Sequence, residues 1–128
     1  MEAIRALVID DLPFMRGAVR EVLEEAGVCV AGEAHSGKEG LRLYGRLKPD
    51  IVLLDIVLPP AGMDAFTFLR ELTRFDPCAR VIVSAVLGDE ELVVRAIQLG
   101  ARDFIVKPFV PERVVAAVWK VFNQNGRD

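Results

Sequence analysis

The sequence predicts an α/β protein in which five parallel strands form one sheet with helices on both faces. Five short apolar runs alternate with five longer segments of helical periodicity along the 128 residues, and this alternation is typical of strands connected by crossover helices. Hydrophobic residues make up 52% of the chain, which favours strands buried on both faces. The length suits a single domain, which we expect to span residues 1–124, followed by a short polar tail at 125–128.

Local signals place the individual elements along the chain. The apolar runs that predict strands are Leu7–Ile9, Val28–Gly32, Ile51–Leu54, Val81–Val83 and Phe104–Val106. Proline in a first turn, and Ser or Asp just before one, favour helix starts, which predicts helices beginning near Pro13, Ser36, Asp64, Asp89 and Pro111. Glycine favours a helix end, so we expect the first helix to stop at Gly27 and the fourth at Gly100.

Five strands with right-handed crossovers fit the flavodoxin-like (βα)5 arrangement, a three-layer sandwich whose parallel sheet has the order 2-1-3-4-5. In such a sheet every strand ends at the same edge. Ligands bind at that edge, where the order of connections reverses. Here the reversal falls between the first and the third strand.

Polar residues follow four of the predicted strands. Asp10 and Asp11 follow the first strand, Asp55 the third, Ser84 the fourth and Lys107 the fifth. Three carboxylates that meet at one edge repel one another unless a cation joins them, and Mg²⁺ suits such oxygen ligands. A carboxylate beside Mg²⁺ can act as a nucleophile towards phosphorus, while a lysine and a hydroxyl hold the phosphoryl oxygens. The set therefore predicts phosphoryl transfer.

Each of these residues also has an ordinary structural explanation when taken alone. Two aspartates before a helix can form a solvated capping pair, and an Asp, a Ser or a Lys after a strand is a common loop residue. The chain has only four lysines, so one placed at this edge is less easily a coincidence. The meeting of all these residues at one edge favours the functional interpretation.

The segment Gly32–Glu39 has two interpretations. It nearly matches the phosphate-binding pattern G-x-x-x-x-G-K-[ST] between a strand and a helix. However, Glu39 stands where a hydroxyl would hold Mg²⁺, and Glu33 would repel phosphate. A capping box explains the same residues, because Ser36 and Glu39 can each accept a hydrogen bond from the other's backbone N–H. A nucleotide-binding enzyme with a P-loop is therefore the weaker alternative.

Composition excludes several classes of partner. The net charge is −3, and no run of basic residues suggests nucleic-acid binding; the arginines are scattered, among them Arg16, Arg20, Arg42, Arg46, Arg70 and Arg74. The apolar runs are too short to span a membrane, and the first residues lack the layout of a signal peptide. We therefore expect a cytoplasmic protein that binds neither nucleic acid nor membrane.

The sequence resembles the receiver domains of two-component response regulators over nearly its whole length, and most of all the stand-alone, chemotaxis-type members. The segments that carry the resemblance are Val8–Asp11, Lys48–Asp55, Ser84–Ala85 and Asp103–Phe109. The resemblance implies a phosphoacceptor switch that assists its own phosphorylation and dephosphorylation, and not an enzyme in the usual sense. The expected phosphodonor is a sensor histidine kinase or a small acyl phosphate.

The resemblance also assigns roles to single residues. Asp55 would be the phosphoacceptor, with Ser84 and Lys107 contacting the phosphoryl group. Mg²⁺ would be held by Asp10, Asp11, Asp55 and the backbone carbonyl of Val57. Phe104 would be the switch aromatic, and a downstream target protein would bind the face around it, with the unphosphorylated protein a monomer. No further cofactor is expected.

Further expectations concern the loops and the peptide after Lys107. The resemblance implies a cis bond between Lys107 and Pro108. The loop Leu58–Gly62 is one residue shorter than the family pattern, and the loop 85–89 is one residue longer, with Gly88 as its hinge. Val57 and Val86 occupy the two positions that most often modulate loss of the phosphoryl group in this family, and both are apolar. We therefore expect a comparatively long-lived phosphoaspartate.

Three alternatives stay open at this point. A receiver module cut from a longer regulator, for example a transcriptional one, would have the same sequence features. A degenerate receiver would bind partners without being phosphorylated, although the acidic set is intact. A phosphatase of the haloacid dehalogenase type would need a second Asp where Val57 stands, which disfavours it.

Overall fold

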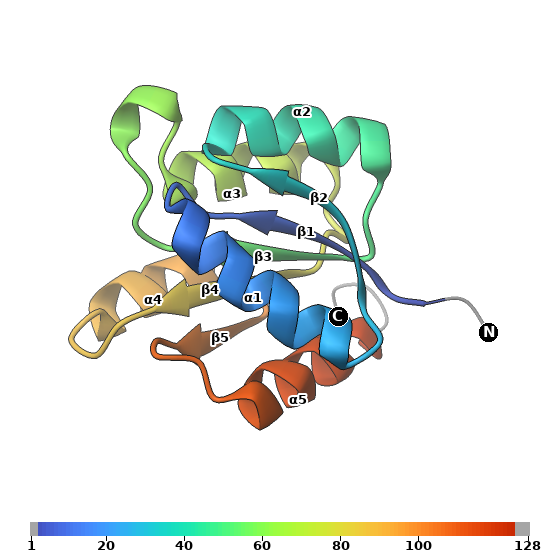
Figure 1. Ribbon diagram of the computed structural model, residues 1–128. Coiled ribbons are helices and arrows are strands. Elements are labelled where there is room, and N and C mark those ends of the chain that lie inside the picture. Colours follow the sequence, from blue (N-terminus) through green and yellow to red (C-terminus); the bar gives the residue numbers. More distant parts are fainter. Residues whose placement is uncertain (1–2, 125–128) are drawn as a thin grey trace.

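The computed structural model describes residues 3–124 and has the predicted alternation of strands and helices (Figure 1). The strands are β1 (Arg5–Ile9), β2 (Cys29–Ala34), β3 (Ile51–Asp55), β4 (Val81–Ala85) and β5 (Asp103–Val106). The helices are α1 (Pro13–Glu25), α2 (Gly37–Leu47), α3 (Ala65–Phe75), α4 (Glu90–Gln98) and α5 (Pro111–Phe122), with a short 3₁₀ turn at Pro60–Gly62. The expected tail at 125–128 lies outside the described residues.

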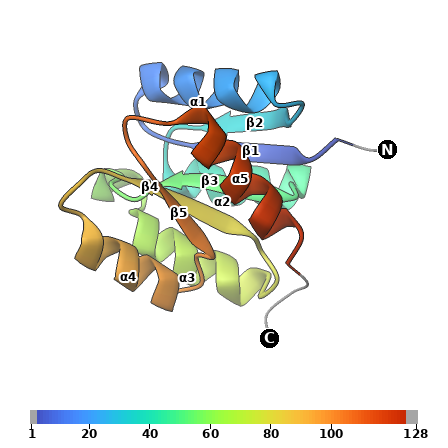
Figure 2. The same cartoon turned by 90° about the horizontal axis from the view of Figure 1, so that it is seen from below.

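The five strands form one parallel sheet of order β2-β1-β3-β4-β5, which confirms the predicted flavodoxin-like topology. Helices α1 and α5 cover one face, and α2, α3 and α4 cover the other, as Figures 1 and 2 show from two directions. The predicted three-layer sandwich is therefore correct. No helix among the described residues is both long and apolar enough to cross a membrane.

The central strand β3 divides the hydrophobic core into two halves. All five of its residues are buried, and their side chains alternate between the faces of the sheet. Val52 and Leu54 belong to the cluster under α2, α3 and α4, whereas Ile51 and Leu53 belong to the cluster under α1 and α5. Burial on both sides fixes the position of β3, and with it the position of Asp55 at its end.

The glycines predicted to end helices do so with the expected hydrogen bonds. Gly27 (φ +85°) and Gly100 (φ +118°) are in the left-handed region, which glycine adopts without steric strain. After α1, the N–H of Gly27 donates to Glu24 and that of Val28 to Leu23. This pair of bonds is the Schellman motif, and it turns the chain sharply towards β2.

Two of the predicted helix starts differ in detail. Ser36 accepts a hydrogen bond from the Glu39 N–H at 3.2 Å, but the Glu39 carboxylate accepts from the N–H of His35, at 2.9 Å, and not from that of Ser36. The second half of the predicted capping box is therefore wrong by one residue. Asp89 precedes α4 as predicted but makes no capping bond, because its carboxylate accepts from the N–H of Val86.

Gly37 is required where the loop after β3 crosses the start of α2. A Cβ atom added to Gly37 would lie 2.6 Å from the Met63 carbonyl oxygen, and one added to Gly62 would lie 2.8 Å from the Ser36 Cβ. Both distances are shorter than van der Waals contact allows. The glycine that makes this segment look like a P-loop is thus explained by close packing of the backbone.

We expect Gly37→Ala to lower the free energy of unfolding by about 1–3 kcal/mol, because the added methyl group has to displace the Met63 backbone. Gly45→Ala is the matched control in the same helix. Apart from its chain neighbours and the backbone of its own helix, no atom lies within 4 Å of the Cβ that it would add, so it should stabilise the protein by about 0.5–1 kcal/mol through helix propensity. Urea unfolding of both variants measures the two effects. Equal stability of the two variants would contradict the packing argument.

Candidate functional site

The predicted site residues meet at the carboxyl edge of the sheet, where β1, β3, β4 and β5 end. Asp10, Asp55 and Ser84 are only 3%, 6% and 6% exposed, and they are the buried polar or charged residues found in the described part of the chain. Asp55 and Ser84 lie side by side in the register of β3 and β4. Folding therefore brings the buried polar side chains of the described residues together at the carboxyl edge of the sheet.

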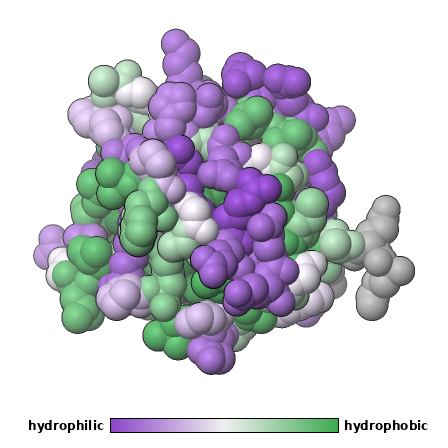
Figure 3. All heavy atoms as spheres, in the orientation of Figure 1, coloured by the Kyte–Doolittle hydropathy of each residue, from purple (hydrophilic) through white to green (hydrophobic). Residues whose placement is uncertain are grey.

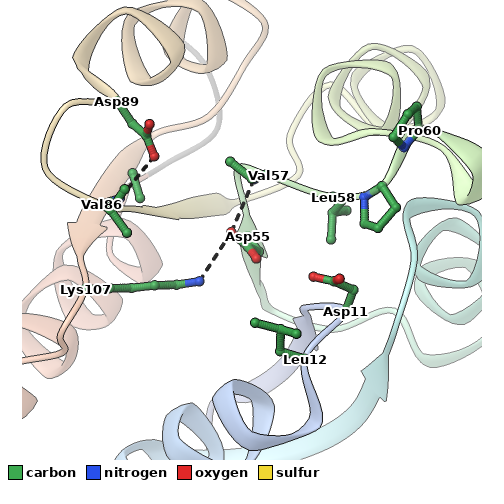
Figure 4. Close-up of a pocket in the computed structure, with 11 residues that line it drawn as sticks. Asp11, Leu12, Asp55, Val57, Leu58, Pro60, Val86, Asp89 and Lys107 are labelled. Carbon is green, nitrogen blue, oxygen red and sulfur yellow. Dashed lines mark hydrogen bonds and ion pairs between the residues drawn. The ribbon is translucent and has the colours of Figure 1, made fainter.

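The three carboxylates lie close enough to share a cation. One oxygen atom each of Asp10, Asp11 and Asp55 can be chosen so that all three lie within 4.8 Å of one another. Figure 4 shows the Asp11 carboxylate pointing towards Asp55. Mg²⁺ binds oxygen ligands at about 2.0–2.1 Å and keeps several waters, so this arrangement fits such an ion with small shifts or a bridging water.

Lys107, which directly follows β5, completes the cluster. Its Nζ atom lies 3.4 Å from Asp55 Oδ1 and 3.5 Å from Asp10 Oδ2. The structure thus brings together Asp10, Asp11, Asp55 and Lys107 as the sequence predicted. The peptide bond between Lys107 and Pro108 is cis, which confirms that expectation.

Backbone hydrogen bonds orient the two buried carboxylates. Asp10 Oδ1 accepts from the N–H of Leu12 at 2.9 Å, and Asp55 Oδ1 accepts from the N–H of Val57 at 3.2 Å. The backbone N–H of Asp10 donates to the Ala34 carbonyl at 3.0 Å, which ties it to the end of β2. That the Val57 carbonyl is a metal ligand stays a prediction.

The electrostatics of the site favour cation binding. Burial, and after it the negative charge of Asp10, raise the pKa of Asp55 from 3.8 to about 6, and the nearby Lys107 ammonium only partly opposes this. A raised carboxyl pKa means that the charged form is disfavoured. One lysine therefore leaves uncompensated negative charge, which a divalent cation would neutralise.

The carboxylates open into a pocket of about 440 Å³ that is largely lined by apolar side chains. Its rim includes Leu12, Val57, Leu58, Pro59, Pro60 and Val86, several of which are labelled in Figure 4. None of residues 32–39 lines this pocket, and His35 instead pairs with Glu39 at 2.8 Å. The P-loop-like segment is therefore separate from the acidic cluster.

Phe104 lies on β5 outside the pocket, and its side chain is 37% exposed. Around it, α4, β5 and α5 carry further exposed apolar residues, namely Val94, Ile97, Val106 and Trp119. In Figure 3 hydrophobic surface also gathers at the left, on the side where the loop after β4 lies in Figure 1. The role of Phe104 as a switch stays a prediction.

Two contacts at the site had no signal in the sequence. Arg16 donates a hydrogen bond to the Asp10 backbone carbonyl at 2.6 Å, although the arginines look merely scattered in the sequence. Asp89 accepts from the Val86 N–H at 3.2 Å and lines the same pocket as Asp55. Both contacts depend on how loops turn, which periodicity does not describe.

The fold and the site define a receiver module, and the comparisons with known proteins agree. The family model for the response regulator receiver domain matches residues 6–119, so the chain belongs to this family. It is 47% identical over 118 residues to the chemotaxis protein CheY of Thermotoga maritima, covering 91% of this chain and 96% of that protein. It is 40% identical over 121 residues to CheY of Bacillus subtilis, covering 94% and 99%.

Solved structures show the same similarity. The CheX–CheY–BeF₃–Mg²⁺ complex from Borrelia burgdorferi contains a chain that is 34% identical, with a TM-score of 0.86 and coverage of 94% of this chain and 90% of that one. The receiver domain of NtrX from Brucella abortus is 29% identical, with a TM-score of 0.87 and coverage of 94% and 99%. The expected resemblance to receiver domains of the CheY type is confirmed.

We expect Asp55→Asn to stabilise the metal-free protein at high pH. Because the folded-state pKa of Asp55 is raised to about 6, the stability associated with the neutral acid is present below about pH 4 and is lost as the pH rises through 6. The shift corresponds to roughly 3 kcal/mol at most, and partial solvation reduces the expected gain to about 1–2 kcal/mol.

Urea unfolding in the presence of a chelator, at pH 4 and pH 8, measures this effect. The variant and the wild type should have nearly equal stability at pH 4 and differ at pH 8. Added Mg²⁺ should narrow the difference at pH 8 by stabilising the wild type. A variant less stable than the wild type at pH 8 without metal would show that Lys107 outweighs the repulsion from Asp10.

Proposed function

We propose that this protein is a two-component response regulator in which Asp55 accepts a phosphoryl group from a phosphohistidine of a sensor histidine kinase. The observation that carries the proposal is the position of the Asp55 carboxylate, which lies beside two further carboxylates and 3.4 Å from Lys107 Nζ. This arrangement offers a nucleophile, a set of ligands for Mg²⁺ and a cation for phosphoryl oxygens. Phosphorylation then acts as a switch and not as one step of a turnover reaction.

The reaction forms one bond and breaks one. An Asp55 carboxylate oxygen attacks phosphorus while the bond between phosphorus and the kinase imidazole nitrogen breaks. The imidazole leaves with the electron pair, and Asp55 becomes an acyl phosphate. Bound Mg²⁺, held by Asp10, Asp11, Asp55 and the Val57 carbonyl, would supply charge neutralisation.

The residues of this chain have separate tasks in that step. At neutral pH the Asp55 carboxyl, with a pKa of about 6, is mostly ionised and can act as a nucleophile. Lys107 lies between Asp10 and Asp55, so its ammonium can move to an incoming phosphoryl oxygen without leaving the carboxylates. Ser84, next to Asp55 in the adjacent strand, would donate a hydroxyl hydrogen bond to another phosphoryl oxygen.

Output would pass to the face formed by α4, β5 and α5. Ser84 belongs to β4, and Lys107 directly follows β5, which carries Phe104 and Val106 on its exposed side. A shift of these strand ends on phosphorylation would alter this face, where we place the downstream target protein. The similarity to CheY proteins supports a chemotaxis pathway and a cytoplasmic location, with no direct binding of nucleic acid and a monomer before phosphorylation.

A receiver module from a longer regulator is the second candidate. The chain is 44% identical over 109 residues to the Geobacter sulfurreducens protein-glutamate methylesterase/protein-glutamine glutaminase 3, of which it covers only 29%. Receiver modules thus also occur within larger chains. The chain covers 96% and 99% of the two CheY proteins but only 29% of the methylesterase, and this near-complete coverage favours the chemotaxis assignment.

Incubation with acetyl phosphate tests the phosphoacceptor directly. Intact mass should increase by one phosphoryl group in the wild type when Mg²⁺ is present, and neither Asp55→Asn nor chelator-treated wild type should be labelled. Asp11→Ala should be labelled at least about tenfold more slowly because a metal ligand is lost. Asp89→Asn is the matched control, since Asp89 lines the same pocket but bonds to the Val86 N–H. Label that persists in Asp55→Asn would refute the assignment.

The phosphoaspartate should be comparatively long-lived. It is lost when water attacks in line, and the apolar Val57 and Val86 at the pocket rim cannot orient that water by hydrogen bonding. We therefore expect Val57→Asn combined with Val86→Glu to speed decay of the label after the phosphodonor is removed. Leu87→Glu, next in the chain but outside the pocket lining, should decay like the wild type. Equal rates of label loss in the wild type and both variants would show that these rim side chains do not affect hydrolysis of the phosphoaspartate.

A further inference from the structure

Arg16 links the acidic turn after β1 to the neighbouring strand β2. Its Nη1 atom donates to the Asp10 backbone carbonyl at 2.6 Å, and its Nε atom lies 3.3 Å from Glu33 Oε1. Arg20, one turn further along α1, donates to the other carboxylate oxygen of Glu33. One carboxylate of β2 therefore holds two guanidinium groups of α1, and only the first of them reaches the acidic turn.

The turn that this contact holds lacks a capping side chain. Helix α1 begins at Pro13 after Leu12, which makes no side-chain capping bond. The backbone of Asp10 is instead held from two sides, because its N–H donates to the Ala34 carbonyl of β2 and its carbonyl accepts from Arg16. The Asp10 carbonyl is part of the peptide unit that joins Asp10 to Asp11. The bonds that fix the Asp10 backbone therefore also limit where the Asp11 side chain can point.

We propose that Arg16 is a positioning residue for the cation site, acting through the Asp10 backbone carbonyl and anchored by Glu33. The inference rests on the proposed function, because it concerns the ion that the three carboxylates would hold. Without an ion these carboxylates repel one another, and that repulsion favours movement of the turn after β1 away from Asp55. The Arg16 contact opposes this movement and keeps the ligands close together before the ion arrives.

Positioning and simple charge make opposite predictions for Mg²⁺ binding. A guanidinium near the site repels the ion, so loss of its charge alone would tighten binding slightly, by an amount that salt screens. Loss of a group that orients ligands weakens binding, typically on the order of tenfold or more. Arg20 separates the two effects, because it shares Glu33 with Arg16 and makes no bond to Asp10.

The experiment compares Arg16→Met with Arg20→Met. Calorimetry should give a Mg²⁺ dissociation constant about tenfold higher in Arg16→Met and within about twofold of the wild type in Arg20→Met. Arg16→Met loses its ion pair with Glu33 and its bond to the Asp10 carbonyl, and Arg20→Met loses its ion pairs with Glu33 and Glu24, so urea unfolding in chelator should show modest losses of stability in both. Arg16→Lys keeps the charge but cannot reach both partners with a planar fork, and should lie between Arg16→Met and the wild type.

A second measurement needs no metal. In metal-free protein the backbone N–H of Leu12, which donates to Asp10 Oδ1, should exchange its hydrogen faster in Arg16→Met than in the wild type. Its exchange rate in Arg20→Met should equal that of the wild type. If Arg16→Met fails to fold, the same comparison is made between Arg16→Lys and Arg20→Lys.

The possible outcomes separate the inference from the function on which it rests. A wild type that binds no Mg²⁺ would refute the proposed cation site itself. Wild-type binding that is unchanged or tighter in Arg16→Met, or equally weakened in Arg20→Met, would refute the positioning role alone. Weaker binding confined to the Arg16 variants, with faster exchange at Leu12, would establish it.

Discussion

Repulsion among three carboxylates at one edge of the sheet is the constraint on which the site depends. Asp10 and Asp55 are buried at the ends of β1 and β3, where low solvation strengthens their mutual repulsion. The two strands cannot separate to relieve it, since both are paired along their length and packed on both faces. The free energy of the hydrophobic core therefore keeps an unfavourable charge arrangement in place, which a bound cation would relieve.

Compensation for this charge comes from elements far apart in the chain. Lys107 reaches the carboxylates from the end of β5, 97 residues beyond Asp10. Backbone N–H groups of Leu12 and Val57 donate to the same carboxylates, and Arg16 holds the Asp10 carbonyl from α1. The result is a site with enough attraction to keep its geometry but too little positive charge to neutralise its carboxylates, which is the condition that the proposed phosphorylation switch requires.

The same strand ends connect the site to the exposed face. In β5 successive side chains point to opposite sides, so buried Ile105 lies between exposed Phe104 and Val106, and Lys107 follows directly. The loop after β4 carries Val86 at the pocket rim and the exposed Leu87 beside it, and Gly88 at φ +102° lets that loop turn. Asp55 at the end of β3 is thus separated only by β4 from a strand with exposed apolar residues.

The sequence by itself determined the fold class and which residues meet at the candidate site, because parallel strands end at a common edge and the residues after each apolar run therefore lie there. Asp10, Asp11, Asp55 and Lys107 follow from that rule alone. Only the tertiary structure decided which oxygen each donor reaches: Glu39 bonds to His35, Asp89 to Val86 and Arg16 to the Asp10 carbonyl. Such contacts depend on the path of each loop and the angle of each helix on the sheet, which arise from packing between distant segments and leave no periodic trace in the sequence.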